Sequence, residues 1–155
     1  MAESQASGKA RAQCREIMTT NVTSVGPNAP IREAAAMMRD GDIGSLPVVE
    51  NGRLVGIVTD RDIVVRAIAE GADASTAVST AMTADVFSVK PDDFVFEAIR
   101  LMGDKQVRRI PVVSDDGKLA GIIAMADIAL EVEDEREIAE ALEEISSGSA
   151  FWSKK

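Results

Sequence analysis

Apolar residues recur three and four positions apart in two stretches of the chain, which is the spacing of one face of an α-helix. The residues that share this spacing are Ile31, Ala34, Ala35 and Met38 in the first stretch, and Val95, Ala98, Ile99 and Met102 in the second. Pro30 suits the first turn of the first helix, and Gly41 suits a left-handed residue at its end. The pattern predicts an amphipathic helix in each half of the chain.

Short runs rich in β-branched residues lie before and after each of these helices and predict strands. The residues at 22–25 and at 86–89 are each followed by a proline, which cannot continue a ladder of hydrogen bonds. Two further runs, at 46–49 and 54–58, are joined by Asn51-Gly52, a strong signal for a hairpin turn. A second helix is expected from about residue 60 to residue 71, and its counterpart from about residue 127.

The two halves of the chain are copies of each other. Residues 17–27 align with 81–91, and the Leu-Pro-Val-Val run at 46–49 aligns with Ile-Pro-Val-Val at 110–113. The turn at Asp115-Asp116-Gly117 holds one extra residue, after which the alignment continues to Asp62 and Asp127. Such self-similarity predicts a duplicated supersecondary unit. A unit of about 60 residues has a marginal core alone, so two copies are expected to pack together.

The expected fold is therefore α+β, with a β-α-β-β-α unit occurring twice and packed as a pseudo-two-fold pair. Clefts are expected where the copies meet. The predicted boundaries are a flexible segment at 1–13, the first repeat at 14–76, the second repeat at 77–136, and an acidic helix and tail at 137–155.

Composition removes several kinds of chemistry. The chain of 155 residues has no histidine, which excludes imidazole acid–base catalysis, Ser-His and Cys-His pairs, and every metal site that uses histidine. Cys14 is the only cysteine, so there is no intrachain disulfide and no cysteine cluster for zinc or iron–sulfur. Cys14 aligns with Val78, and a small apolar position explains it better than a redox-sensing thiol. We expect no bound metal.

The net charge of −9 is concentrated near the C-terminus. Residues 131–144 carry −7 and leave only −2 to the rest of the chain. A nearly neutral body with an acidic tail does not suit binding to a phosphate backbone, so no nucleic-acid partner is expected. Residues 1–16 lack the apolar stretch of a signal peptide, and no apolar run approaches a membrane span. We expect a soluble cytoplasmic protein.

The stretch Gly-Ile-Val-Thr-Asp-Arg-Asp-Ile at 56–63 carries the most chemical information. Thr59 lies where a strand ends and a helix begins, and Asp62 follows three residues later. One interpretation is a capping box, which requires no ligand. The other is a phosphate cradle at a helix N-terminus, with a carboxylate placed to accept hydrogen bonds from two ribose hydroxyls.

The duplicated unit, the Pro-Val-Val strands and this motif resemble a tandem cystathionine-β-synthase (CBS) domain pair, also called a Bateman module. The resemblance covers about residues 14–136. It is specific because the motifs follow one another in the same order and occur twice. It implies a regulatory module without catalysis, of the stand-alone bacterial type, that binds AMP, ADP or ATP. S-adenosylmethionine is not excluded.

The resemblance also implies site residues. In the first site Thr59 would contact phosphate and Asp62 would contact the ribose. Arg108 and Arg109 would also contact phosphate, a role that suits the forked guanidinium group of arginine. A solvated pair of arginines at a strand start is the alternative for Arg108 and Arg109. The residues implied for this nucleotide site are Thr59, Asp60, Asp62, Val86, Phe87, Val89, Val107, Arg108, Arg109 and Ile110. A second, weaker site would hold Asp127, Gly44, Ser45 and Leu46, where Ala124 replaces the hydroxyl residue and the arginines are missing.

Two rival functions remain open. One is a structural interaction module with a vestigial site, and the other is a fragment of inosine-monophosphate dehydrogenase, whose catalytic barrel is missing here. A homodimer is expected, because the helix faces described above and a C-terminal apolar stripe at Ile138, Leu142 and Ile145 need partners. The downstream protein partner is unknown.

Overall fold

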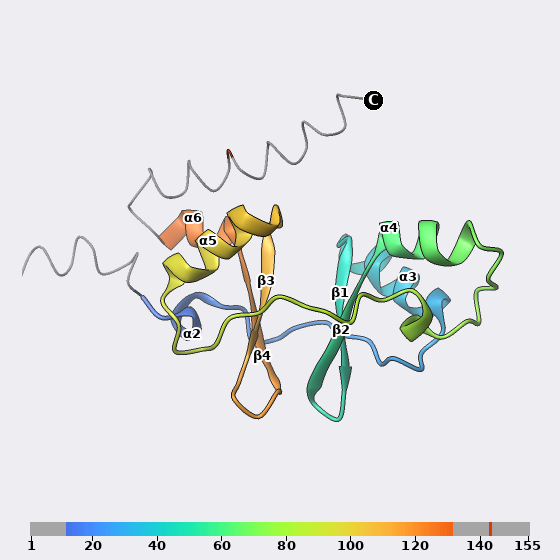
Figure 1. The fold of residues 1–155 in the computed structure, drawn as a ribbon, viewed down its shortest axis with the longest axis horizontal. Helices are drawn as coiled ribbons and strands as arrows, with labels where there is room; N and C mark the ends of the chain where they lie inside the picture. The colour runs from blue at the N-terminus through green and yellow to red at the C-terminus, as the bar shows by residue number, and fades with distance from the viewer. Residues whose placement is uncertain (1–11, 132–142, 144–155) are drawn as a thin grey trace, which may run out of the picture. The chain divides into compact units, whose positions relative to one another are not determined.

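The computed structural model describes residues 12–131 and residue 143 (Figure 1). These residues form two compact units. The Thr59 unit contains residues 22–86 and 116–119. The Arg108 unit contains the other described residues, at 12–21, 87–115, 120–131 and 143. The expected N-terminal segment at 1–13, except for its last two residues, and most of the acidic stretch lie outside the described residues.

The Thr59 unit is built on one antiparallel hairpin, β1 with β2 (Figure 1). Leu46 and Val58 lie opposite each other in the hairpin, and both are fully buried. The α-helix that precedes the hairpin buries Ile31, Ala34 and Met38 in the same core. The elements are α3 (Ile31–Gly41), β1 (Ser45–Glu50), β2 (Arg53–Thr59), α4 (Asp60–Asp62), the π-helix η1 (Ile63–Ile68) and the 3₁₀ helix η2 (Val78–Thr80).

The Arg108 unit repeats this plan around the hairpin of β3 and β4 (Figure 1). Its long helix buries Val95, Ala98, Ile99 and Met102 against that hairpin. The elements are α2 (Cys14–Ile17), α5 (Val95–Lys105), β3 (Arg109–Val113), β4 (Leu119–Ala124) and α6 (Met125–Glu131). The expected order of helices and hairpins is confirmed in both units.

The predicted hairpin turn is confirmed, since Asn51 and Gly52 both have positive φ, at 54° and 82°. The predicted helix end is wrong by one residue. Helix α3 includes Gly41, and the left-handed residue is Asp42, with φ 50°. Asp tolerates this conformation better than most residues do. Gln106 holds the same place after α5, with φ 58°.

The predicted strands at 22–25 and 86–89 are reduced to single bridging residues. Val25 pairs in parallel with Val48: its N–H donates to Pro47 at 3.0 Å, and its carbonyl accepts from Val49 at 2.9 Å. In a parallel ladder the next bond on one side would need an N–H from Pro47, and on the other an N–H from Pro27. Proline has no backbone N–H to donate, so the ladder stops on both sides. Val89 pairs with Val112 under the same restriction.

Each unit takes its leading segment from the other copy of the repeat. The Cys14 N–H donates to the carbonyl of Asp93 at 2.8 Å, inside the Arg108 unit. In the Thr59 unit, the Val78 N–H donates to the carbonyl of Ala29 at 2.8 Å. Cys14 and Val78 are both fully buried, each in the core of the unit that it joins. The boundaries of the compact units therefore differ from those of the sequence repeats, which lie at 14–76 and 77–136.

The prediction that the apolar faces of the two long helices remain uncovered and available for a dimer contact is wrong for most of their residues. Ala34, Met38, Ala98, Ile99 and Met102 are buried in the cores of their own units, because the neighbouring hairpin covers them. Only Ala35 of that set is exposed. The stripe at Ile138, Leu142 and Ile145 lies outside the described residues. Among the described residues, no helix combines the length and hydropathy needed to cross a bilayer.

Candidate functional site

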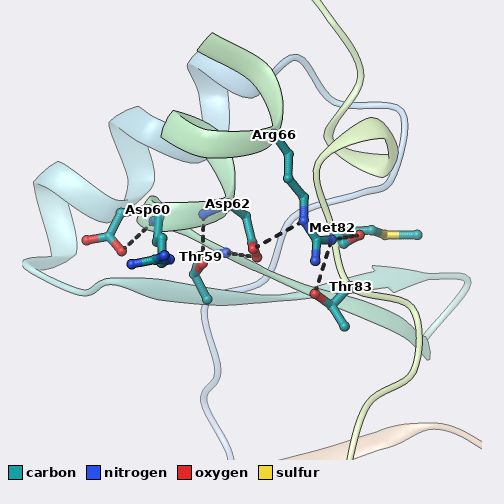
Figure 2. A network of polar contacts seen from close by, with 7 residues as sticks. Thr59, Asp60, Asp62, Arg66, Met82 and Thr83 are labelled. Carbon is teal, nitrogen blue, oxygen red and sulfur yellow. Dashed lines mark hydrogen bonds and ion pairs between the residues drawn. The ribbon is translucent and has the colours of Figure 1, made fainter. Parts of the chain in front are cut away.

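Thr59 and Asp62 form a reciprocal capping box where β2 meets α4 (Figure 2). The Thr59 backbone is extended, and its hydroxyl oxygen accepts a hydrogen bond from the Asp62 N–H at 3.0 Å. In return, Asp62 Oδ2 accepts from the Thr59 N–H at 3.0 Å. The capping-box interpretation of this motif is thus confirmed, and the box fixes both side chains at the helix start.

The box leaves part of each side chain's hydrogen-bonding capacity for a ligand. A hydroxyl that accepts a bond keeps its own hydrogen for donation, and a carboxylate with one oxygen in the box keeps the second as an acceptor. The Asp62 side chain is 16% exposed, so the carboxylate is largely shielded from water but still reaches the surface. Capping and ligand binding are therefore compatible at Thr59 and Asp62.

The residues around the helix start come from the beginning of β1. The Asp60 N–H donates to the carbonyl of Gly44 at 2.9 Å, and Ser45 lies opposite Thr59 in the hairpin. A Cβ at Gly44 would lie 3.3 Å from Asp60 Oδ2. Gly44 and Ser45, assigned from the sequence to the second site, thus lie beside Thr59 and Asp60 of the first. Leu46 is fully buried in the core.

Arg66 connects the box to a distant segment of the same unit (Figure 2). Its Nε lies 3.9 Å from Asp62 Oδ1, and its Nη1 donates to the carbonyl of Met82 at 3.3 Å and to Thr83 Oγ1 at 3.4 Å. Arg66 is not among the site residues predicted from the sequence. The spacing of four between Asp62 and Arg66 on a helix could have indicated the ion pair, whereas nothing local indicates the contact with Met82 and Thr83.

In the Arg108 unit the equivalent helix start has no hydroxyl residue. The Met125 N–H donates to the carbonyl of Arg108 at 2.8 Å, as Asp60 does to Gly44. Asp127 lies in the first turn of α6, but Ala124 holds the place of Thr59 and cannot accept from it. The side chains of Arg108 and Arg109 are exposed beside this helix start.

The apolar residues predicted for the nucleotide site differ in exposure. Val89 and Ile110 belong to the core of the Arg108 unit, so their side chains offer little surface to a ligand. Val107 is half-buried and packs against that core. Phe87 is 43% exposed, and the ammonium of Lys105 lies 4.3 Å above its ring centroid, at cation–π distance. One face of the Phe87 ring is thus already occupied.

The residues predicted for each site are divided between the two units. The first site has Thr59, Asp60, Asp62 and Val86 in the Thr59 unit, and Phe87, Val89, Val107, Arg108, Arg109 and Ile110 in the Arg108 unit. The second site has Gly44, Ser45 and Leu46 in the Thr59 unit, and Asp127 in the Arg108 unit. Each unit by itself brings together one helix start and the beginning of one hairpin.

Cys14 is a core residue. It is fully buried, and its Sγ lies 3.8 Å from the carbonyl oxygen of Phe94. Burial, reinforced by the carboxylate of Asp93, raises the pKa of the Cys14 thiol from 9.0 to about 12. A thiol with such a pKa is poorly nucleophilic at neutral pH. Within residues 12–131, no group of three or more Cys, Asp or Glu side chains has the geometry of a metal site.

The CBS domain family matches residues 14–68 and 78–134, which are the two copies of the repeat. The chain is 41% identical over 132 residues to the CBS domain-containing protein YhcV of Bacillus subtilis, covering 85% of this chain and 94% of YhcV. It is 41% identical over 117 residues to hypoxic response protein 1 of Mycobacterium tuberculosis, covering 74% and 81%. The chain therefore belongs to the CBS domain family, and the predicted family and α+β fold are confirmed.

Solved structures of CBS proteins resemble this chain and several contain ligands. Hypoxic Response Protein I, solved with two coordinated zinc ions, matches with a TM-score of 0.70 and 39% identity, covering 78% of this chain and 99% of that one. The CBS pair of MJ0100 holds 5′-methylthioadenosine and S-adenosylmethionine (TM-score 0.66, 28% identity, coverage 77% and 94%). CBSX2 holds AMP (TM-score 0.68, 26% identity, coverage 76% and 93%). Because one neighbour contains zinc, the expected absence of a metal stays a prediction.

The similarity to inosine-monophosphate dehydrogenase is limited to part of that enzyme. The enzyme of Methanocaldococcus jannaschii is 40% identical over 114 residues, which are 73% of this chain but only 22% of the enzyme. The match thus falls on a small part of the dehydrogenase. Stand-alone CBS pairs are typically regulatory rather than catalytic.

Proposed function

We propose that this protein is a regulatory module that binds an adenine nucleotide and signals through a change in shape or in partner affinity. The observation that carries the proposal is the Thr59–Asp62 box. It holds a hydroxyl and a carboxylate in fixed orientations at a helix start, and both retain hydrogen-bonding capacity. The neighbours that hold AMP or S-adenosylmethionine support the adenosine class.

The chemistry of each group suggests its role. The Thr59 hydroxyl suits a phosphate, because it keeps its own hydrogen for donation at a helix start, where the helix dipole is positive. The Asp62 carboxylate suits the two hydroxyls of a ribose, since both are donors. Arg108 and Arg109 are exposed and would add charge-assisted bonds to phosphate. Val86, Phe87 and Val107 would supply apolar surface for the adenine ring.

Isothermal titration against AMP, ADP, ATP and S-adenosylmethionine tests the proposal. We expect saturable binding of at least one of them, with about one phosphorylated ligand per chain. Arg109→Ala should abolish or strongly weaken it, whereas Arg39→Ala, an exposed arginine of α3, should not. No binding by the wild-type chain would instead support the alternative, a structural interaction module in which the box only caps the helix.

The site of Asp127 is proposed to be the weaker one. Ala124 provides no hydroxyl, and Gly44 and Ser45 provide no cation where the first site has Arg108 and Arg109. Two contacts to phosphate are therefore missing together. Two equal sites per chain in the titration would overturn this assignment.

We also propose a homodimer acting in the cytoplasm on a protein partner not yet identified. The support lies on η1, where Val64, Val65 and Ile68 are between 48% and 63% exposed although all three are apolar. An exposed apolar patch of this kind is typical of an interaction site. A two-fold homodimer is the commonest assembly that buries such a patch.

A further inference from the structure

The Arg66 guanidinium forms an ion pair, with Nε 3.9 Å from Oδ1, with the second oxygen of the carboxylate that the proposed function assigns to ribose. Asp62 Oδ2 is fixed by the Thr59 N–H, and Oδ1 lies toward the Arg66 guanidinium (Figure 2). The terminal torsion of an Asp side chain is broad, so a single anchor lets the carboxylate rotate about it. Two anchors, one on each oxygen, define the plane of the group.

The guanidinium is itself held from outside its helix. Its Nη1 donates to the carbonyl of Met82 and to the hydroxyl of Thr83. That segment is fixed to β2, because Thr83 and Ile57 exchange two backbone hydrogen bonds at 2.8 and 2.9 Å. Arg66 therefore connects Asp62 to a rigid part of the unit, although its own side chain is 51% exposed.

We propose that Arg66 is a positioning residue for ribose recognition: it orients the Asp62 carboxylate toward the two ribose hydroxyls through its contacts with Met82 and Thr83. The inference rests on the proposed function and deepens it. Two directed hydrogen bonds to a diol require a fixed acceptor plane, which is what the second anchor provides. The aligned residue in the second copy is Glu131, which provides no cation for Asp127.

The test separates the ribose contact from the rest of the ligand. Binding of AMP and ATP is titrated beside that of their 2′,3′-dideoxy counterparts, which lack both hydroxyls, with wild type, Arg66→Gln and Arg66→Lys. We expect Arg66→Gln to weaken the binding of AMP and ATP up to about fivefold, the equivalent of a partly exposed ion pair, and to leave the dideoxy ligands unchanged. Arg66→Lys keeps the charge without the fork and should be intermediate.

Two further variants test the connection itself. Thr83→Val removes one partner of Arg66 but not the backbone pairing with Ile57, and should produce a smaller loss with the same selectivity. In an Asp62→Ala background, Arg66→Gln should cause no additional loss, because residues acting as a unit are not additive. Arg39→Gln, which removes the same charge from α3, is the control and should change neither class of ligand.

The possible failures are distinguishable. If wild type binds the dideoxy and natural nucleotides equally, or binds none of them, the ribose role of Asp62 fails and this inference fails with it. If wild type prefers the natural nucleotides but Arg66→Gln weakens both classes equally, nucleotide binding stands and only the positioning role of Arg66 is overturned.

Discussion

A Cβ on Gly56 would lie 2.9 Å from the carbonyl oxygen of Thr83, closer than real Cβ atoms approach. That oxygen cannot withdraw easily, because it accepts the Ile57 N–H at 2.9 Å. Gly121 has the same relationship with Thr19, whose oxygen would lie 2.6 Å from the added carbon. Each glycine thus permits a leading segment to pair with a central strand.

Gly56→Ala and Gly121→Ala should therefore both lower the free energy of unfolding, by about 1–3 kcal/mol or more, because the backbone would have to move to admit the methyl group. Urea denaturation measures the change. Gly41→Ala is the matched control, since its Cβ would meet only the Ile43 side chain at 3.5 Å inside a helix, and it should be neutral or stabilising by up to about 1 kcal/mol. Equal effects at all three positions would contradict the explanation.

Asp62→Ala distinguishes capping from ligand binding. The cap contributes about 1 kcal/mol at most, so the free energy of unfolding should fall by no more than that. Nucleotide affinity should fall by about 1.5–3 kcal/mol for each ribose bond lost. Denaturation and calorimetry on the same preparation give the two values. A loss of stability with unchanged affinity would assign the box to capping alone.

The pKa of Cys14 predicts a loss of stability at high pH. The folded thiol keeps its proton up to about pH 12, whereas an unfolded cysteine loses it near 9.0. Between these values unfolding releases a proton, so the free energy of unfolding falls as pH rises, by up to about 1.4 kcal/mol per pH unit. Below pH 9 the thiol contributes no pH dependence.

Lysine residues also titrate in this range, so the informative quantity is the difference between wild type and Cys14→Ala. The variant should lose less stability from pH 9 to pH 11. Parallel curves for the two proteins would show that Cys14 ionises as freely in the folded state as in the unfolded one.

The exchange of leading segments predicts which fragment of the chain folds. Residues 22–86 contain nearly the whole Thr59 unit, including Val78 and its core contacts. Residues 12–76 have the same length and match a repeat of the sequence, but lack that segment. We expect cooperative thermal unfolding, followed by circular dichroism, only for 22–86. If 12–76 is the more cooperative fragment, the sequence repeat and not the contact unit is the folding unit.

If the protein is a homodimer, light scattering should give a molecular mass of about 33 kDa, twice that of the 16.4 kDa chain. Ile68→Glu places a charge on the exposed apolar group of η1 and should shift the mass toward the monomer at tens of micromolar. Ala74→Glu adds the same charge at an exposed position after that helix and serves as the control. A wild-type monomer, or equal responses of the two variants, would remove η1 from the interface.

The sequence by itself determined the features that depend on neighbouring residues. The Asn51-Gly52 turn, the two long helices and the Thr59–Asp62 box all arise from hydrogen bonds or packing between residues a few positions apart, so their patterns predict them. The duplication is equally visible in the sequence. Even the failure of the predicted strands has a local cause, in prolines that were present in the pattern.

Only the tertiary structure decided which distant segments meet. Periodicity shows that Ala34 and Met38 share a face, but not that their own hairpin covers it. Alignment equates Cys14 with Val78, but both copies offer each leading segment an equally suitable hairpin, so the choice of partner depends on the path of the chain. The contact of Arg66 with Thr83 follows from that choice, because it exists only where the segment containing Thr83 pairs with β2.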